Sequence, residues 1–223
     1  MDAVDQWSAG IVMMADPQVS AIPVRECGEE LVDASDRADL LLSSFRADDS
    51  GVFAWVRGGV LDRLAMASQA LPDGLRLLIV ECYRPPALQR RYFDGYLETL
   101  RAANPEWDAQ RLRMAASRYV SPPELAPHSA GAAVDLTLCT DDGAELDLGT
   151  QVNATPEKSQ GRCYTNSPDL DDQARHNRAV LSAALRGAGL VNYPTEWWHW
   201  SYGDRYWAMI TGAAEAIYGP REL

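Results

Sequence analysis

The 223-residue sequence predicts an α+β fold with a central, mainly antiparallel sheet flanked by helices. Helix-like and strand-like segments alternate irregularly along the chain, and no internal repeat is found. No linker rich in Gly, Ser or Pro, and no block of like charge, divides the sequence. We therefore expect residues 1–223 to form a single domain.

The first half of the chain predicts a helix–strand–helix order. Apolar residues at helical spacing indicate a helix over 59–71, which a Pro-Asp-Gly turn ends. An apolar strand follows over 75–83, and an Arg-Pro-Pro sequence stops it because proline cannot continue a sheet. Further helices are expected over 88–100 and about 108–119.

The second half predicts two strands and two helices. Alternating apolar and polar residues indicate a strand over 132–138. The sequence Ser-Pro-Asp at 167–169 supplies a cap residue, a first-turn proline and an acid, so a helix should begin there and run to about Gly187. The aromatic run 193–202 suggests another strand, and a last helix is expected over 206–217.

Composition limits the classes of partner. The net charge of −12 argues against nucleic acid and against anionic membrane surfaces. No stretch approaches the roughly 20 apolar residues that cross a bilayer, and the first residues lack the pattern of a signal peptide, so a cytoplasmic location is expected. None of the cysteines forms a Cys-x-x-Cys pair, which favours free and mostly buried thiols: Cys27, Cys82, Cys139 and Cys163.

Two short segments contain two of the three histidines. One runs from His128 to Asp135 through Ser-Ala-Gly-Ala-Ala-Val, and the other reads Glu196-Trp-Trp-His199. Together they offer two imidazoles and a carboxylate as metal ligands, with a second carboxylate nearby. Catalytic zinc needs this inventory: three protein ligands, a position left for water, and a base for the water's proton.

Each segment alone also has an ordinary interpretation. His128 and Asp135 could be a loop histidine and a strand-edge aspartate, and Glu196 and His199 could belong to an aromatic core strand. The use of two of three histidines in two such segments favours the metal site. The third, His176, lies four residues before Val180 on a helical stripe, so we expect a partly buried structural histidine.

Three segments carry a resemblance to a known family. They are Tyr83-Arg84-Pro85, the ten residues 128–137, and the five residues 196–200. They resemble the zinc D-alanyl-D-alanine dipeptidases of the vancomycin-resistance type, members of a wider group of zinc D,D-peptidases that shares its fold with the hedgehog signalling domain. The resemblance runs in matching order over about residues 75–210, whereas residues 1–70 diverge from the family.

The resemblance implies a mechanism and a substrate class. It implies one zinc ion per chain, with His128, Asp135 and His199 as the ligands. It implies that Glu196 is the general base and acid, and that Arg84 stabilises the oxyanion. The expected substrate is a small dipeptide such as D-Ala-D-Ala; homo-oligomerisation is left open.

The sequence departs from the family where substrate is bound. Family members usually have serine where this chain has Ala126, and Phe-Asp where it has Val152-Asn153. The resemblance places Ala126 and Asn153, together with Tyr83, in substrate recognition. An asparagine in place of aspartate removes a charge that would complement the free ammonium of a dipeptide.

Two other hypotheses follow. The first is a cytoplasmic zinc amide or lactam hydrolase of a biosynthetic pathway, acting on a small substrate without a free amine; Asn153 and Ala126 motivate it. The second is a non-catalytic, zinc-stabilised binding module, which would need neither Glu196 nor Arg84. A preference for free over N-acylated dipeptides would discard the former, and loss of turnover in Glu196→Gln the latter.

Overall fold

The computed structural model describes residues 8–45 and 50–223. Its main sheet has five strands in the order β2-β4-β5-β7-β6, parallel between β2 and β4 and antiparallel at the other pairs. A separate antiparallel pair joins β1 to β3. The prediction of an α+β fold with a mainly antiparallel sheet is confirmed. The strands are β1 (Leu31–Asp33), β2 (Leu41–Leu42), β3 (Trp55–Arg57), β4 (Leu75–Glu81), β5 (Ala133–Thr140), β6 (Val191–Asn192) and β7 (His199–Ser201).

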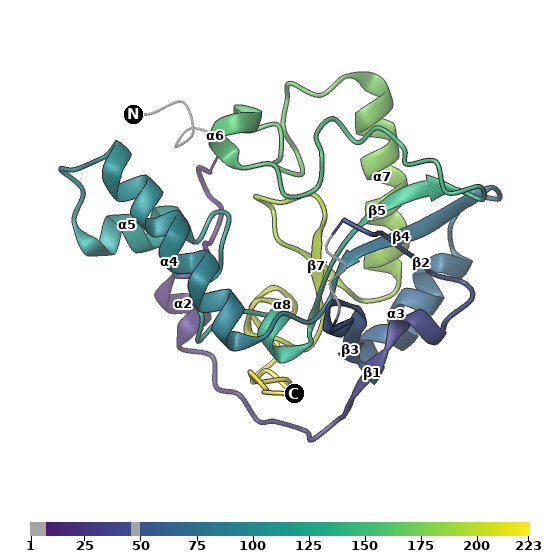
Figure 1. Ribbon diagram of the computed structural model, residues 1–223, viewed down its shortest axis with the longest axis horizontal. Helices are drawn as coiled ribbons and strands as arrows, with labels where there is room; N and C mark the ends of the chain where they lie inside the picture. The colour runs from purple at the N-terminus through teal and green to yellow at the C-terminus, as the bar shows by residue number, and fades with distance from the viewer. Residues whose placement is uncertain (1–7, 46–49) are drawn as a thin grey trace.

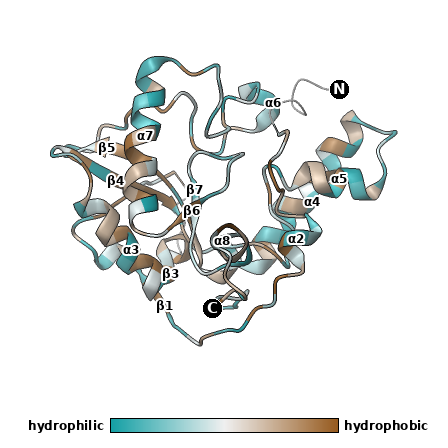
Figure 2. Cartoon of the chain, turned by 180° about the vertical axis from the view of Figure 1, so that it is seen from behind, coloured by the Kyte–Doolittle hydropathy of each residue, from teal (hydrophilic) through white to brown (hydrophobic). Residues whose placement is uncertain are grey.

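The helices lie on two sides of the molecule. In Figure 1 the α4–α5 pair stands at the left and α3 and α7 at the right, with β7 between them. Figure 2 shows hydrophobic and hydrophilic residues alternating along α3 and α7, as expected for helices that cover a core on one side. The helices are α2 (Pro17–Ser20), α3 (Gly58–Gln69), α4 (Pro86–Ala103), α5 (Ala109–Ala116), α6 (Pro156–Ser159), α7 (Asp172–Gly187) and α8 (Arg205–Thr211).

The core is built on the two long central strands. Every residue of β5 except the last is buried, and β4 is buried at its carboxyl end. Three tryptophans of the aromatic run are almost completely buried, as the sequence predicted: Trp197, Trp198 and Trp200. Three of the four cysteines are buried, and all four are free thiols in the described part of the chain. Among the described residues no helix combines the length and apolarity that a bilayer crossing requires.

Two predicted helices differ at an end. The helix expected from Ser167 begins instead at Asp172, because the Asp171 carboxylate caps it by accepting a hydrogen bond from the amide of Ala174. The last helix ends at Thr211 rather than residue 217, since Gly212 takes the left-handed conformation that terminates helices.

Two further expectations were wrong in part. The aromatic run 193–202 is not one strand: only His199–Ser201 pairs in the sheet, and a turn that contains Pro194 precedes it. His176 is exposed on α7 rather than partly buried, because the apolar stripe of this helix passes through Ala174 and Leu181.

Gly131 makes the turn between His128 and β5. Its φ is 64°, and a Cβ there would lie 2.2 Å from Cδ2 of Leu31. We expect Gly131→Ala to lower the free energy of unfolding by about 1–2 kcal/mol from the left-handed backbone alone, with Leu31 forced to move. Denaturant unfolding measures this change.

Gly95→Ala is the matched control. Gly95 lies inside α4, and a Cβ there meets nothing within 4 Å. This substitution should raise the free energy of unfolding by about 1 kcal/mol, because alanine is the better helix former. Equal effects of the two substitutions would contradict the role assigned to the turn.

Candidate metal centre and active site

Strand pairing brings the two histidine segments together. In the registers of β4 with β5 and of β5 with β7, Glu81 is opposite Asp135, and Asp135 is opposite His199. Residues opposite one another on neighbouring antiparallel strands share a face of the sheet, with Cβ atoms about 5 Å apart. The pairing therefore places an acid, a second acid and an imidazole in one row across three strands.

His128 reaches this row from a short 3-10 helix, His128–Ala130, just before β5. Gly131 turns the chain there, as the sequence suggested. The Nδ1 atom of His128 lies 2.6 Å from the carbonyl oxygen of Cys82, so it must donate its proton to that oxygen. In the neutral ring, Nε2 then carries a lone pair.

The lone pair of His128 Nε2 faces a carboxylate. Nε2 lies 3.3 Å from Oδ1 of Asp135, and Nδ1 of His199 lies 3.0 Å from the same oxygen. Ligand atoms of these three buried residues all lie within 4.8 Å of one another. A lone pair directed at a carboxylate is repulsive unless a proton or a cation lies between them, and an Nδ1–H bond to a carbonyl is the usual support of a metal-ligating histidine. The three side chains therefore fit a metal ion.

The ionisation of the group suits a cation as well. Burial lowers the pKa of His199, so its imidazole is neutral at neutral pH. Burial alone would raise the pKa of Asp135, but the two imidazoles beside it hold this pKa well below its usual range. Two neutral nitrogens and one carboxylate are the donors that zinc prefers in catalytic sites.

Glu196 lies beside this group, in the turn before β7. Its Oε2 is 3.9 Å from Nδ1 of His199, and its side chain is buried. Burial, reinforced by the charge of Asp135, raises the pKa of Glu196 well above the ordinary glutamate value. A carboxylate with a raised pKa, next to a metal-ligand atom, is suited to accept and return a proton.

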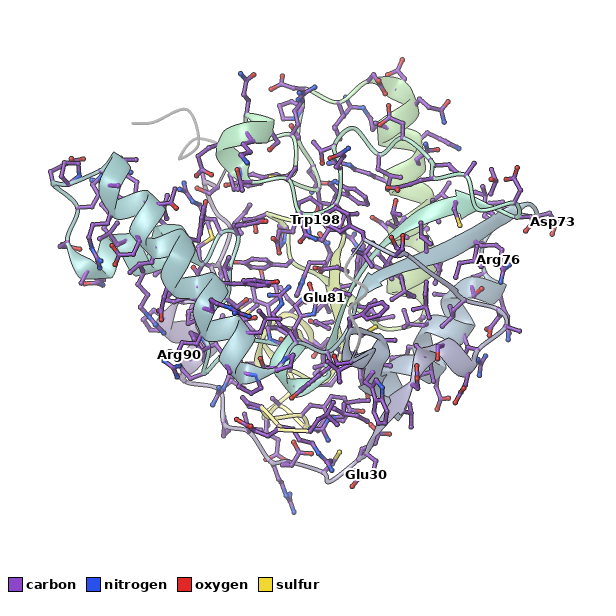
Figure 3. All side chains as sticks on the ribbon, in the orientation of Figure 1. Glu30, Asp73, Arg76, Glu81, Arg90 and Trp198 are labelled. Atoms are coloured by element: carbon purple, nitrogen blue, oxygen red, sulfur yellow. The ribbon has the colours of Figure 1, made fainter. Side chains whose placement is uncertain are left out.

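Arg84 is held rigidly at the end of β4. Its Nε and Nη2 donate to the two carboxylate oxygens of Glu81, at 2.8 and 2.6 Å, and Nη1 donates to Oε1 of Gln89 at 2.8 Å. Burial opposes the charge of Glu81, yet Arg84 lowers the pKa of that carboxyl and keeps the pair ionised. In Figure 3 Glu81 points into the middle of the molecule, whereas Arg90 projects from α4. Arg84 is thus a fixed, buried cation.

Two adjoining cavities lie over the group. The inner one has a volume of about 20 Å³ and is bordered by the three potential metal ligands, Glu196 and Ala126. The outer one measures about 230 Å³. Both are lined by Arg84, Tyr119 and Asn153.

Of the three residues that the sequence assigned to substrate binding, the structure places Ala126 and Asn153 at the cavities but not Tyr83. The ring of Tyr83 is buried, and its hydroxyl donates to the carbonyl oxygen of Arg221. Strand alternation explains this difference, because neighbouring residues at the end of β4 point in opposite directions.

Sequence reasoning missed three contributors to the site: Glu81, Gln89 and Tyr119. Glu81 had a usable signal, since it is an acid that ends an otherwise apolar strand three residues before Arg84. Gln89 and Tyr119 had none, because their importance depends on how α4 and the segment after α5 pack beside the sheet.

The comparisons with known proteins agree with this geometry. The profile of the D-ala-D-ala dipeptidase family matches residues 60–212. A D-alanyl-D-alanine dipeptidase from Synechocystis sp. is 31% identical over 216 residues, covering 84% of this chain and 87% of that protein. The chain belongs to the D-Ala-D-Ala dipeptidase family. It is accordingly a zinc metallopeptidase by family, which favours an enzyme over the zinc-stabilised binding module.

Other relatives of this dipeptidase-family chain match over shorter spans. The D-alanyl-D-alanine dipeptidase of Escherichia coli is 29% identical, over 57% of this chain and 55% of its own length. That of Enterococcus faecium is 28% identical, over 60% and 66%. Among solved structures, the LD-carboxypeptidase LdcB covers 89% of this chain at a TM-score of 0.41 and 17% identity. The Zn(II)-bound vancomycin-resistance D,D-pentapeptidase VanY covers 95% at 0.38 and 16%, and neither likeness is close enough to carry an argument.

Proposed function

We propose that this family member hydrolyses the amide bond of a small D-Ala-D-Ala-like dipeptide, with one zinc ion held by His128, Asp135 and His199. The observation that carries the proposal is the convergence of these ligand atoms within 4.8 Å, with the Glu196 carboxylate 3.9 Å from one of them. A zinc ion bound there would supply the positive charge that acidifies a water molecule and polarises the amide carbonyl.

The side chains of the chain divide the remaining work. Glu196 accepts a proton from water, and the hydroxide oxygen bonds to the carbonyl carbon. Arg84 donates hydrogen bonds to the oxyanion of the tetrahedral carbon, and its own charge does not change. Glu196 then returns the proton to the amide nitrogen as the C–N bond breaks, which releases an acid and an amine.

Release of D-alanine tests the proposal. Zinc-loaded protein should hydrolyse D-Ala-D-Ala, or an acylated form of it, and lose that activity when a chelator removes the metal. The free amine produced is measured by amino-acid analysis. Failure to cleave any member of a panel of free and N-acylated D,D-dipeptides between pH 6 and 9 would refute the proposed reaction.

Arg84→Lys tests the oxyanion role. Lysine keeps the charge but cannot pair with both oxygens of Glu81 while reaching the substrate, so kcat should fall roughly 10²–10³-fold with zinc content unchanged. The matched control is Arg90→Lys, on the exposed side of α4, which should leave kcat as in the wild type. Wild-type turnover in Arg84→Lys would remove Arg84 from the mechanism.

A further inference from the structure

The inner cavity alone cannot hold a substrate. Its volume of about 20 Å³ suits a water molecule, which needs roughly 10–15 Å³ by this kind of measure, but not a dipeptide. A substrate whose amide lies beside Glu196 must therefore extend past Arg84, Tyr119 and Asn153 into the outer cavity of about 230 Å³, because these three residues line both.

Asn153 presents an unsatisfied donor at this junction. Its backbone is left-handed, with φ of 64°, and its carbonyl oxygen accepts a hydrogen bond of 2.9 Å from the Tyr119 hydroxyl. Its buried Nδ2 has no hydrogen-bond partner among the residues that the structure describes. A buried N–H without an acceptor is unfavourable, so the group that binds here should supply an oxygen. An ammonium supplies only donors, and Asn153 offers it no charge.

The outer cavity is aromatic and carries no acid. Its lining is Arg84, Tyr92, Tyr96, Tyr119, Val120 and Asn153. Tyr96 and Tyr119 pack edge to face with ring centroids 5.1 Å apart. The nearby carboxylate of Glu157 is occupied, since it accepts hydrogen bonds from the Tyr96 hydroxyl and lies 3.6 Å from Arg118. Such a cavity favours an uncharged group of apolar or aromatic character over an ammonium.

We propose that the preferred substrate carries an N-acyl group in place of a free amine. The acyl carbonyl accepts a hydrogen bond from Asn153 Nδ2, and an apolar acyl substituent fills the tyrosine-lined cavity. This inference rests on the proposed function and narrows its substrate. The reaction is N-acyl-D-Ala-D-Ala plus water to N-acyl-D-Ala plus D-Ala: the C–N bond breaks, the carbonyl carbon gains OH and the nitrogen gains H.

Calorimetry with three ligands tests the inference without turnover. Zinc-loaded Glu196→Gln protein is titrated with D-Ala-D-Ala, N-acetyl-D-Ala-D-Ala and N-benzoyl-D-Ala-D-Ala. We expect the acetyl compound to bind about tenfold tighter than the free dipeptide, for one hydrogen bond to a buried donor, and the benzoyl compound about tenfold tighter again. Asn153→Asp in the same background should reverse the order of acetylated and free dipeptide, because aspartate pairs with ammonium and tolerates the left-handed backbone.

The outcomes separate this inference from the proposed function. Equal or tighter binding of the free dipeptide would overturn the inference, even if wild-type protein cleaves D-Ala-D-Ala. Equal binding of the acetyl and benzoyl compounds would overturn the role of the outer cavity. Conversely, the predicted binding order without hydrolysis of any compound by the wild type would uphold the recognition and refute the chemistry.

Discussion

Replacing Glu196 by glutamine is expected to lower kcat by about 10²–10⁴-fold while zinc content stays at the wild-type level. Glutamine has nearly the same shape but cannot accept the proton of the attacking water. The side chain is already buried and its pKa is raised by that burial, so loss of the charge should not disturb folding. Steady-state rates and metal analysis of the same preparation measure the two quantities.

Glu106→Gln is the control for this substitution. Glu106 is exposed in the segment between α4 and α5, far along the chain from the site, and its replacement should leave kcat unchanged. If Glu196→Gln kept wild-type turnover, Glu196 would not be the base, and the non-catalytic interpretation of the site would gain support.

Removing the Asp135 carboxylate should abolish metal binding. Asp135 Oδ1 lies between the two histidines, at 3.3 and 3.0 Å from their ring nitrogens, so no other group can replace it as the shared anion. Loss of a partner outside the coordination shell already weakens metal affinity about 10–100-fold, and loss of a ligand should exceed that. We therefore expect Asp135→Ala to retain no zinc after dialysis and to lose all hydrolysis.

Thermal unfolding gives a second measure of the same change. Zinc should raise the melting temperature of the wild type, because a ligand that binds only the folded state stabilises it, and should not raise that of Asp135→Ala. His176→Ala is the matched control, since this histidine is exposed on α7 and its loss should leave the zinc-induced shift intact. A zinc-dependent shift that survived in Asp135→Ala would place the metal elsewhere.

The parts of the fold with local signals were predictable. Strand β4 and helices α3 and α4 follow from apolar spacing and from prolines and glycines at their ends, and these segments lie where the sequence indicated. The start of α7 was wrong because two cap-like acids, Asp169 and Asp171, compete, and only tertiary packing decides between them. The short strand β7 was overestimated, since aromatic residues pack equally well in a buried turn.

The candidate site divides in the same way. The histidines and carboxylates of the metal group were visible as residue types, and one register, Glu81 with Asp135 with His199, explains why they meet. The support of Arg84 by Glu81 and Gln89 depends on a contact between a strand and a helix that no local pattern encodes. The left-handed Asn153 and its unpartnered amide likewise become visible only in three dimensions.

X-ray absorption at the zinc edge is the most direct test of the metal centre. Protein loaded with one equivalent of zinc should show only nitrogen and oxygen neighbours at about 2.0–2.1 Å, with the outer-shell scattering of two imidazoles. A sulfur neighbour at about 2.3 Å, or protein that releases its zinc on dialysis, would contradict a site built from His128, Asp135 and His199.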